Sequence, residues 1–263
     1  MKIAWICEYP LPELTPGRAT HPVPWIVAQA PLVAAAGHDL HIITLSKHVD
    51  EDRVFTRDGV QVHVLRIPRV PRAALLYQRD RAVIHQCLAQ LRPDLVHAFG
   101  TESSFGYAGM TWDGPSVLMI QGIVSAIVGA LGWRILLSQP GLLIALATEW
   151  LTVRRARHVI CETDFAARFV RGCQPRAVTH LVRTPIRDLW FDVAKRAGGT
   201  APELLFVGWG TRAKGLDVAV KAFAALAADY PQATLHVVGS VAPAFLAGVL
   251  QPIVARSGLE SRV

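Results

Sequence analysis

The chain has 263 residues, of which 52% are hydrophobic and 18% are charged, and its formal net charge is +7. The hydrophobic content and the mean hydropathy of +0.33 exclude a disordered chain and leave room for one large domain or two modest ones. The basic residues are scattered or paired, so the positive charge favours phosphates or an anionic membrane face, and we expect no nucleic acid partner.

Over residues 1–185, short apolar runs alternate with helical patterns. Runs that are apolar almost throughout are typical of strands buried on both faces. The expected strands are KIAWIC (2–7), DLHIITL (39–45), VQVHVLRI (60–67), DLVHAF (94–99), SVLMIQ (116–121), RHVIC (157–161) and AVTHLV (177–182). The expected helices cover 23–36, 73–91, 124–155 and 163–171. This alternation predicts an α/β fold with a parallel sheet, in which ligands bind outside the carboxyl ends of the strands.

Residues 186–202 are rich in proline, glycine and charge, which predicts a linker between two domains. We therefore expect a Rossmann-like domain over 1–185 and a second one beginning at 203. The second region, 203–263, shows two strands and two helices, at 203–207, 215–228, 233–238 and 242–257. Because two strands make a thin core with an open edge, we expect this second domain to be incomplete.

The most apolar region, 123–151, could in principle enter a membrane. Charged, polar and proline residues interrupt it, at Arg134, Ser138, Gln139 and Pro140. Neither half reaches the twenty or so apolar residues that a membrane span needs. We expect packed helices there, and contact with a bilayer surface stays open as an alternative.

The N-terminal stretch MKIAWICEYP is too short in its apolar part to predict a signal peptide. The four cysteines and ten histidines show no metal-type spacing, so we expect buried thiols, no bound metal and a reducing, cytoplasmic location.

The stretch ELLFVGWGTRAKGLDVAVKAF, 203–223, predicts a strand, a glycine-rich turn and an amphipathic helix. Gly208 and Gly210 allow a tight turn, and Gly215 opens the helix. Backbone N–H groups at a helix start favour anions, and Arg212 and Lys214 add full charges. The pattern is neither G-x-x-x-x-G-K-[ST] nor G-x-G-x-x-G, so a purely structural turn stays an alternative.

Loops after the strands of the first region carry further candidates. Gly17 and Arg18 lie in a long loop after the first strand, with an ordinary connecting loop as the alternative. His97 ends a strand and Glu102 follows it, although a lone histidine can equally be a packing residue. Two further candidates, Gln121 and Gly122, follow another strand.

Several segments, in order, resemble the GT-B glycosyltransferases of family 4. ELLFVGWGTRAKGLDVAVKAFAAL resembles the family segment LLFVGRL…KGLDVLLEAFAAL, and PLVAAAGHDLHIITL is similar to L…RGHEVTVIT. RPDLVHAFG resembles kPDvVHaHg, IQG resembles tiHG, RHVICETDFAARFV resembles dhviavSefva, and ATLHVVGS resembles a.L.ivG. The resemblance covers almost the whole chain.

This resemblance implies two Rossmann-like domains facing across a cleft, with a glycan, lipid-linked or small-molecule acceptor on the first and a nucleoside-diphosphate sugar on the second. It implies transfer with retention of configuration, without a metal or other cofactor, and a role in cell-envelope polysaccharide synthesis. The basic charge and the apolar region 123–151 make peripheral contact with the inner face of the cytoplasmic membrane an alternative to a purely cytoplasmic location. Lys214 and Arg212 would stabilise the leaving diphosphate, and His97 is the third catalytic candidate. The acceptor-side candidates are Arg18, Glu102, Gln121, Gly122 and Thr163. Gly17 would lie near the donor phosphates, and Thr163 matches the serine of vSe.

The sequence also departs from the family pattern. Phe99, Gln121 and Trp209 replace the family's second histidine, its HG histidine and an arginine, and Thr184 stands where the linker asparagine would be. The family's Glu-x7-Glu segment does not occur after residue 203. We therefore expect a truncated chain that is inactive alone. A non-catalytic subunit completed by another chain and a GT-B nucleotide-sugar epimerase are the alternatives.

Overall fold

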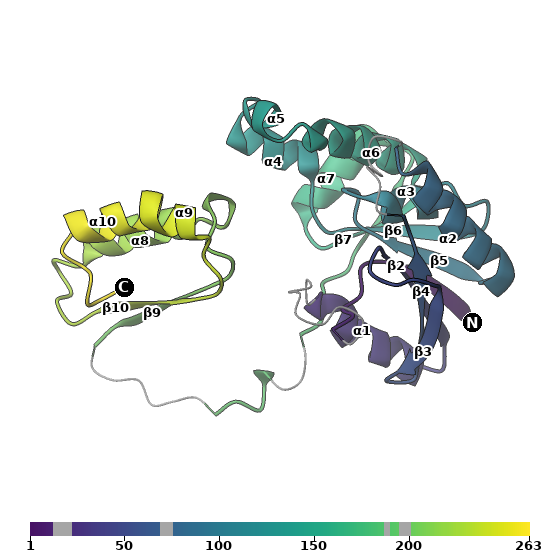
Figure 1. Ribbon diagram of the computed structural model, residues 1–263, viewed down its shortest axis with the longest axis horizontal. Helices are drawn as coiled ribbons and strands as arrows, with labels where there is room; N and C mark the ends of the chain where they lie inside the picture. Colours follow the sequence, from purple (N-terminus) through teal and green to yellow (C-terminus); the bar gives the residue numbers. More distant parts are fainter. Residues whose placement is uncertain (13–22, 69–75, 187–189, 195–200) are drawn as a thin grey trace. The chain divides into compact units, whose positions relative to one another are not determined.

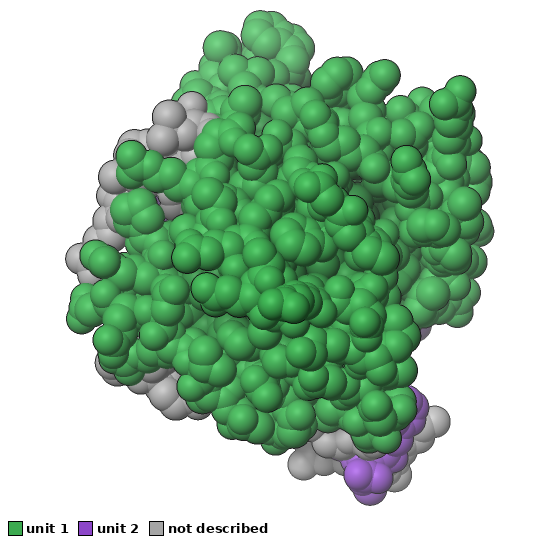
Figure 2. Space-filling view, turned by 90° about the vertical axis from the view of Figure 1, so that its right-hand side faces the viewer, with its two compact units in different colours: residues 1–190 green, residues 191–263 purple. Residues whose placement is uncertain are grey.

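The computed structural model describes residues 1–12, 23–68, 76–186, 190–194 and 201–263 (Figure 1). The chain divides into two compact units, Met1–Trp190 and Phe191–Val263, which are coloured separately in Figure 2. Among the described residues, no helix combines the length and the apolar character needed to cross a bilayer.

Unit 1 is built on an eight-stranded sheet in the order β3-β4-β2-β1-β5-β6-β7-β8. The strands are β1 (Lys2–Ile6), β2 (Asp39–Ser46), β3 (Arg53–Arg57), β4 (Val60–Arg66), β5 (Leu95–Phe99), β6 (Ser116–Ile120), β7 (His158–Cys161) and β8 (Val178–Leu181). All neighbours pair in parallel except β3 and β4, and Ala4 in β1 lies opposite both His41 in β2 and Val96 in β5. The α/β fold with a mostly parallel sheet is therefore confirmed.

Helices pack on both faces of this sheet (Figure 1). The helices are α1 (Pro24–Ala35), α2 (Gln78–Leu91), α3 (Ser104–Met110), α4 (Val124–Leu131), α5 (Ile135–Ser138), α6 (Gly141–Arg155) and α7 (Asp164–Cys173). Successive strand residues face opposite layers: Trp5 packs in one core with Ile26 of α1, and Ile6 packs in another with Ile84 of α2. A third core joins β6 and β7 to α6 and α7. The hydrophobic runs are thus buried on two sides.

Two elements of unit 1 escaped the sequence analysis. Strand β3 alternates exposed and half-buried residues at the sheet edge, so it lacks the apolar run of a central strand. Helix α3, SFGYAGM, is short and contains two glycines, which disfavour helices. Both glycines allow close packing, because a Cβ on Gly106 would collide with the carbonyl of Gly100 and one on Gly109 with the side chain of Ala98.

The predicted helix over 124–155 is wrong in extent, since the structure forms α4, α5 and α6 there. Gly132 follows α4 with φ +82°, a left-handed value that glycine adopts without strain, and Pro140 precedes α6. Breaks at these residues turn one apolar stretch into short helices.

Unit 2 contains two parallel strands, β9 (Glu203–Val207) and β10 (Thr234–Val238). Helices α8 (Leu216–Leu226), α9 (Pro243–Phe245) and α10 (Gln251–Arg256) pack on one side of them, with a short 3-10 turn, η3 (Arg212–Lys214), before α8 (Figure 1). The core of the unit is formed by Leu216, Val220, Phe223 and Leu235. The single helix expected over 242–257 is wrong, since a π-helical segment, η4 (Leu246–Leu250), separates α9 from α10. This segment ends just before Pro252, which has no backbone N–H to donate to a regular helix.

Candidate functional site

The strand order of unit 1 reverses at β1, which lies between β2 and β5. Open α/β sheets bind ligands outside the carboxyl ends of the strands at such a reversal. A pocket of about 180 Å³ lies there, between the loops after β1, β5 and β6. It is lined by Cys7, Glu8, Val23, Trp25, Ile26, Phe99, Glu102, Ser103, Phe105 and Gln121. We call it the switch-point pocket.

The switch-point pocket brings together Glu102 and Gln121, two of the predicted acceptor-side residues. The Glu102 carboxylate accepts a hydrogen bond from the backbone N–H of Thr101 at 2.8 Å. Desolvation raises the pKa of Glu102, and the nearby negative charge of Glu8 raises it further. The carbonyl of Gly122, the third predicted residue, accepts a hydrogen bond from the Thr101 hydroxyl at 3.5 Å.

A buried carboxylate that the sequence analysis missed supports these loops. Glu149 in α6 is only 2% exposed and accepts hydrogen bonds from the backbone N–H groups of Val124, at 2.5 Å, and Ser125, at 3.0 Å. It also accepts one from the Thr101 hydroxyl at 3.4 Å. Glu149 thus stabilises the start of α4 and links the loops that follow β5 and β6. The only signal in the sequence is a lone glutamate in the apolar stretch ALATEWL.

His97 lies in the hydrophobic layer beside the pocket rather than in its lining. Its ring stacks on Phe99, with centroids 4.1 Å apart, and meets Trp5 edge-on at 5.6 Å. Burial lowers the pKa of His97 to about 3, so the imidazole is neutral at physiological pH. Its Nε2 atom has no hydrogen-bond partner in the part of the chain that the structure describes. This placement supports the packing alternative and gives no support to catalysis by His97.

The buried imidazole makes stability depend on pH. The folded pKa of His97 lies below the value of about 6.5 for an unfolded histidine, so protons favour the unfolded chain and stability falls as pH falls from 6.5 toward 3. Between pH 7 and 5.5 we expect His97 to cost roughly 1 kcal/mol. Urea unfolding at both pH values should show this loss, reduced in His97→Gln and unchanged in His158→Gln, whose side chain is exposed. Equal losses in the His97→Gln variant and the wild-type chain would contradict the assignment.

Thr163, the other acceptor-side candidate, has a local structural role. Its hydroxyl caps α7 by accepting a hydrogen bond from the N–H of Ala166 at 3.2 Å. The residue follows β7 and does not line the switch-point pocket. Gly17 and Arg18 lie outside the described residues.

In unit 2, the predicted glycines shape the turn after β9. Gly208 pairs with β10 through its N–H, which donates to the carbonyl of Val238 at 3.0 Å, and a Cβ on Gly239 would collide with the Gly208 carbonyl. Gly210 bridges to Val241 and has no room for a side chain. Gly215 has φ +75° and starts α8. The turn therefore depends on glycine at several positions.

Charges gather at the start of α8. The ammonium of Lys214 is solvent-exposed and forms no ion pair with a carboxylate among the described residues, while its backbone N–H donates to the Thr211 hydroxyl at 3.3 Å. Arg212 lies 4.0 Å from the Asp217 carboxylate, and Lys221 lies 3.9 Å from the same oxygen. Asp217 is buried, and its Oδ1 atom lacks a described partner. The positive site is therefore partly neutralised by an aspartate that the sequence analysis did not single out.

A family model described as Glycosyltransferase Family 4 matches residues 26–187. Sucrose-phosphate synthase from Thermosynechococcus elongatus is similar in structure, with a TM-score of 0.70 at 17% identity over 100% of this chain and 69% of its own. An E. coli structure named for trehalose-6-phosphate and bound with UDP-2-fluoro glucose gives a TM-score of 0.64 at 10% identity, over 98% of this chain and 70% of its own.

A putative UDP-N-acetylglucosamine 2-epimerase from Listeria monocytogenes gives a TM-score of 0.56 at 16% identity, over 99% of this chain and 67% of its own. No curated protein sequence matches the chain. At these identities the similar structures establish the shared α/β fold, and they do not distinguish a transferase from an epimerase.

Proposed function

The chain belongs to Glycosyltransferase Family 4, and from this premise we propose that it moves a sugar from a nucleoside-diphosphate sugar to a hydroxyl-bearing acceptor with retention of configuration. It is a glycosyltransferase of GT-B fold by family and architecture. The observation that carries the donor assignment is the Lys214 ammonium, an exposed cation beside a glycine turn and a helix start.

In the proposed reaction, Lys214 stabilises the negative charge that develops on the departing diphosphate. The N–H groups at the start of α8 and the positive end of its dipole add to this stabilisation. Arg212 contributes after exchanging its contact with Asp217 for the phosphate. Gly208 presents no side chain and lets the phosphate approach the backbone closely, while Gly210 packs against Val241 and shapes the turn.

The proposed acceptor site is the switch-point pocket of unit 1. Glu102 accepts hydrogen bonds and Gln121 both donates and accepts them, which suits the hydroxyl groups of a sugar. Trp25, Phe99 and Phe105 supply apolar walls for its C–H faces. A glycan or a lipid-linked sugar fits this chemistry.

Calorimetric titration with nucleoside diphosphates, in EDTA because we propose that no metal takes part, tests the donor assignment. Among the described residues, no three His, Cys, Asp or Glu side chains group as metal ligands. We expect saturable binding, and its absence for the usual uridine, guanosine and adenosine diphosphates would refute the proposal.

We also propose that the 263-residue chain turns over little by itself. Its only glutamates from residue 203 onward are Glu203 and Glu260, so it has no Glu-x7-Glu pair to hold the donor sugar. A transfer assay with radiolabelled donor sugars should therefore show diphosphate binding without robust product. Rapid transfer by this chain would contradict this part of the proposal.

A non-catalytic subunit is the second candidate, favoured by one face of the β9–β10 pair. Leu205, Val207 and Val238 are all more than half exposed there. An apolar strand face of this kind fits another polypeptide. Sedimentation of the purified chain alone separates the candidates, because a clean monomer that binds nucleoside diphosphates favours the transferase.

We propose that the protein works in the cytoplasm and touches the inner face of the membrane through α4 and α5. Trp133 and Leu137 are 65% and 75% exposed, Ile127 and Leu131 are also exposed, and Arg134 adds a positive charge beside them. Exposed aromatic and aliphatic side chains next to a cation are typical of surfaces that bind anionic bilayers.

Vesicle sedimentation checks the membrane proposal. The double variant Trp133→Ser, Leu137→Ser should reduce binding to vesicles that contain phosphatidylglycerol about tenfold, because about 25 cal/mol of stabilisation is lost for each Å² of apolar surface that no longer inserts. The matched control is Val54→Ser, an exposed apolar residue in β3. Unchanged binding in the double variant, or equal loss in the control, would remove α4 and α5 from the proposal.

A further inference from the structure

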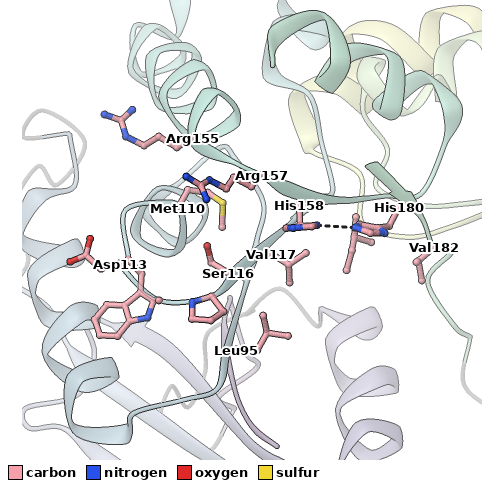
Figure 3. Close-up of a pocket in the computed structure, with 14 residues that line it drawn as sticks. Leu95, Met110, Asp113, Ser116, Val117, Arg155, Arg157, His158, His180 and Val182 are labelled. Carbon is pink, nitrogen blue, oxygen red and sulfur yellow. Dashed lines mark hydrogen bonds between the residues drawn. The ribbon is translucent and has the colours of Figure 1, made fainter. Parts of the chain in front are cut away.

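A second hollow of about 1000 Å³ lies along β5 to β8, beginning at the amino ends of β5, β6 and β7 and reaching Val182, just past the carboxyl end of β8 (Figure 3). It is lined by Leu95, Met110, Trp112, Asp113, Gly114, Pro115, Ser116, Val117, Arg155, Arg157, His158, Ile160, His180 and Val182. We call it the amino-edge hollow. Its volume is in the range of small-molecule sites, and the proposed transfer reaction uses none of its residues.

Positive side chains lie at one end of the amino-edge hollow, where Figure 3 shows Arg155 and Arg157. One N–H of Arg155 donates to the carbonyl of Leu151 at 3.1 Å, and its other N–H groups can donate to a ligand. Arg157 is exposed and makes no ion pair with any carboxylate that the structure describes. Asp113 is the one carboxylate among the lining residues, so the two guanidinium groups leave the lining positive.

An imidazole pair lies at the other end (Figure 3). The Nδ1 atom of His158 is 3.3 Å from the Nε2 atom of His180, and the rings stack with centroids 5.6 Å apart. Two neutral imidazoles carry one N–H each, and their mutual hydrogen bond uses one of them. Whichever tautomer is present, one N–H of the pair is left to donate to a ligand.

Apolar side chains from three strands separate the two polar ends. Leu95 starts β5, Val117 lies in β6 and Ile160 in β7, and all three are half-buried. A site that offers guanidinium groups, a hydrogen-bond donor and an apolar wall selects molecules with matching parts. We propose that the amino-edge hollow binds an amphipathic anion, a phosphate monoester or carboxylate attached to an apolar body, as a ligand separate from the transferase substrates.

Titration of the full chain with n-octyl phosphate, followed by calorimetry, tests this proposal. We expect saturable binding that Arg157→Ala weakens about tenfold or more, because a charge-assisted hydrogen bond is lost. His180→Phe, which removes the pair's hydrogen bond but keeps a ring, should weaken it less. The matched control is Arg168→Ala, an exposed arginine of α7 that does not line the hollow.

Three comparison probes make the result decisive. Inorganic phosphate and octyl glucoside should each bind far more weakly than octyl phosphate, since each offers only half of the proposed ligand. The proposal would be overturned if octyl glucoside bound as tightly as octyl phosphate, or if Arg157→Ala left the affinity for octyl phosphate unchanged. Vesicles containing phosphatidic acid should bind the Arg157→Ala variant as tightly as the wild-type chain. Weaker vesicle binding by this variant would overturn the assignment of a soluble ligand and identify a bilayer headgroup as the ligand of the hollow. Near-UV circular dichroism confirms that each variant is folded.

Discussion

Replacing Lys214 by alanine is expected to weaken nucleoside diphosphate binding about 10- to 100-fold, the loss of one hydrogen bond to a charged group. The ammonium has no carboxylate partner among the described residues, so its positive charge is available to a phosphate without breaking an existing ion pair. It also lies beside the start of α8, where backbone N–H groups favour an anion. Calorimetry at low ionic strength measures the change, because salt screens exposed charges.

Lys221 provides the matched control, since Lys221→Ala removes the same charge from α8, the helix that follows Lys214. Its ammonium lies 3.9 Å from the Asp217 carboxylate, so we expect a loss of less than threefold. Arg212→Ala should fall between the two, because Arg212 must first leave Asp217. An Lys214→Ala variant with wild-type affinity, while a diphosphate still binds, would place the donor phosphate elsewhere.

The strands of unit 1 could be predicted because their sequences are almost continuously apolar. Trp5 and Ile6 face opposite cores, so neither side of the central strand could carry polar residues. Strand β3 lies at the edge and is exposed in part, and helix α3 contains glycines that serve packing against Gly100 and Ala98. Their sequences therefore lack the hydrophobic periodicity on which such predictions depend.

The sequence predicts candidate sites through one rule, that residues which follow parallel strands gather at the carboxyl edge of the sheet. That rule brought Glu102 and Gln121 to one pocket, because both follow neighbouring parallel strands. It could not show that His97 points into the hydrophobic layer, since that depends on which face of β5 the side chain occupies. Nor could it find Asp217 or Glu149, whose roles come from atoms brought close by folding.

Glu149→Ala is expected to lower the free energy of unfolding of unit 1 by about 3 kcal/mol or more, the effect of breaking a buried charged network. The change removes the acceptor for the N–H groups of Val124 and Ser125 and for the hydroxyl of Thr101, and leaves these donors with no described replacement. Urea unfolding, followed by tryptophan fluorescence, measures the loss. Glu51→Gln, an exposed carboxylate change in the same unit, should shift stability by less than about 0.5 kcal/mol.

Glu149→Gln separates folding from positioning, because the amide keeps the size and one oxygen acceptor but turns two donors toward a site that needs acceptors. We expect the variant to fold, with a smaller loss of stability, and to disturb the loop that carries Gln121 and Gly122. Sugar acceptors should then bind more weakly while nucleoside diphosphates bind as before, since the diphosphate residues belong to unit 2. Equal weakening of both ligands would mean that Glu149 acts through global stability, and no effect on either would show that this carboxylate does not position the acceptor loops.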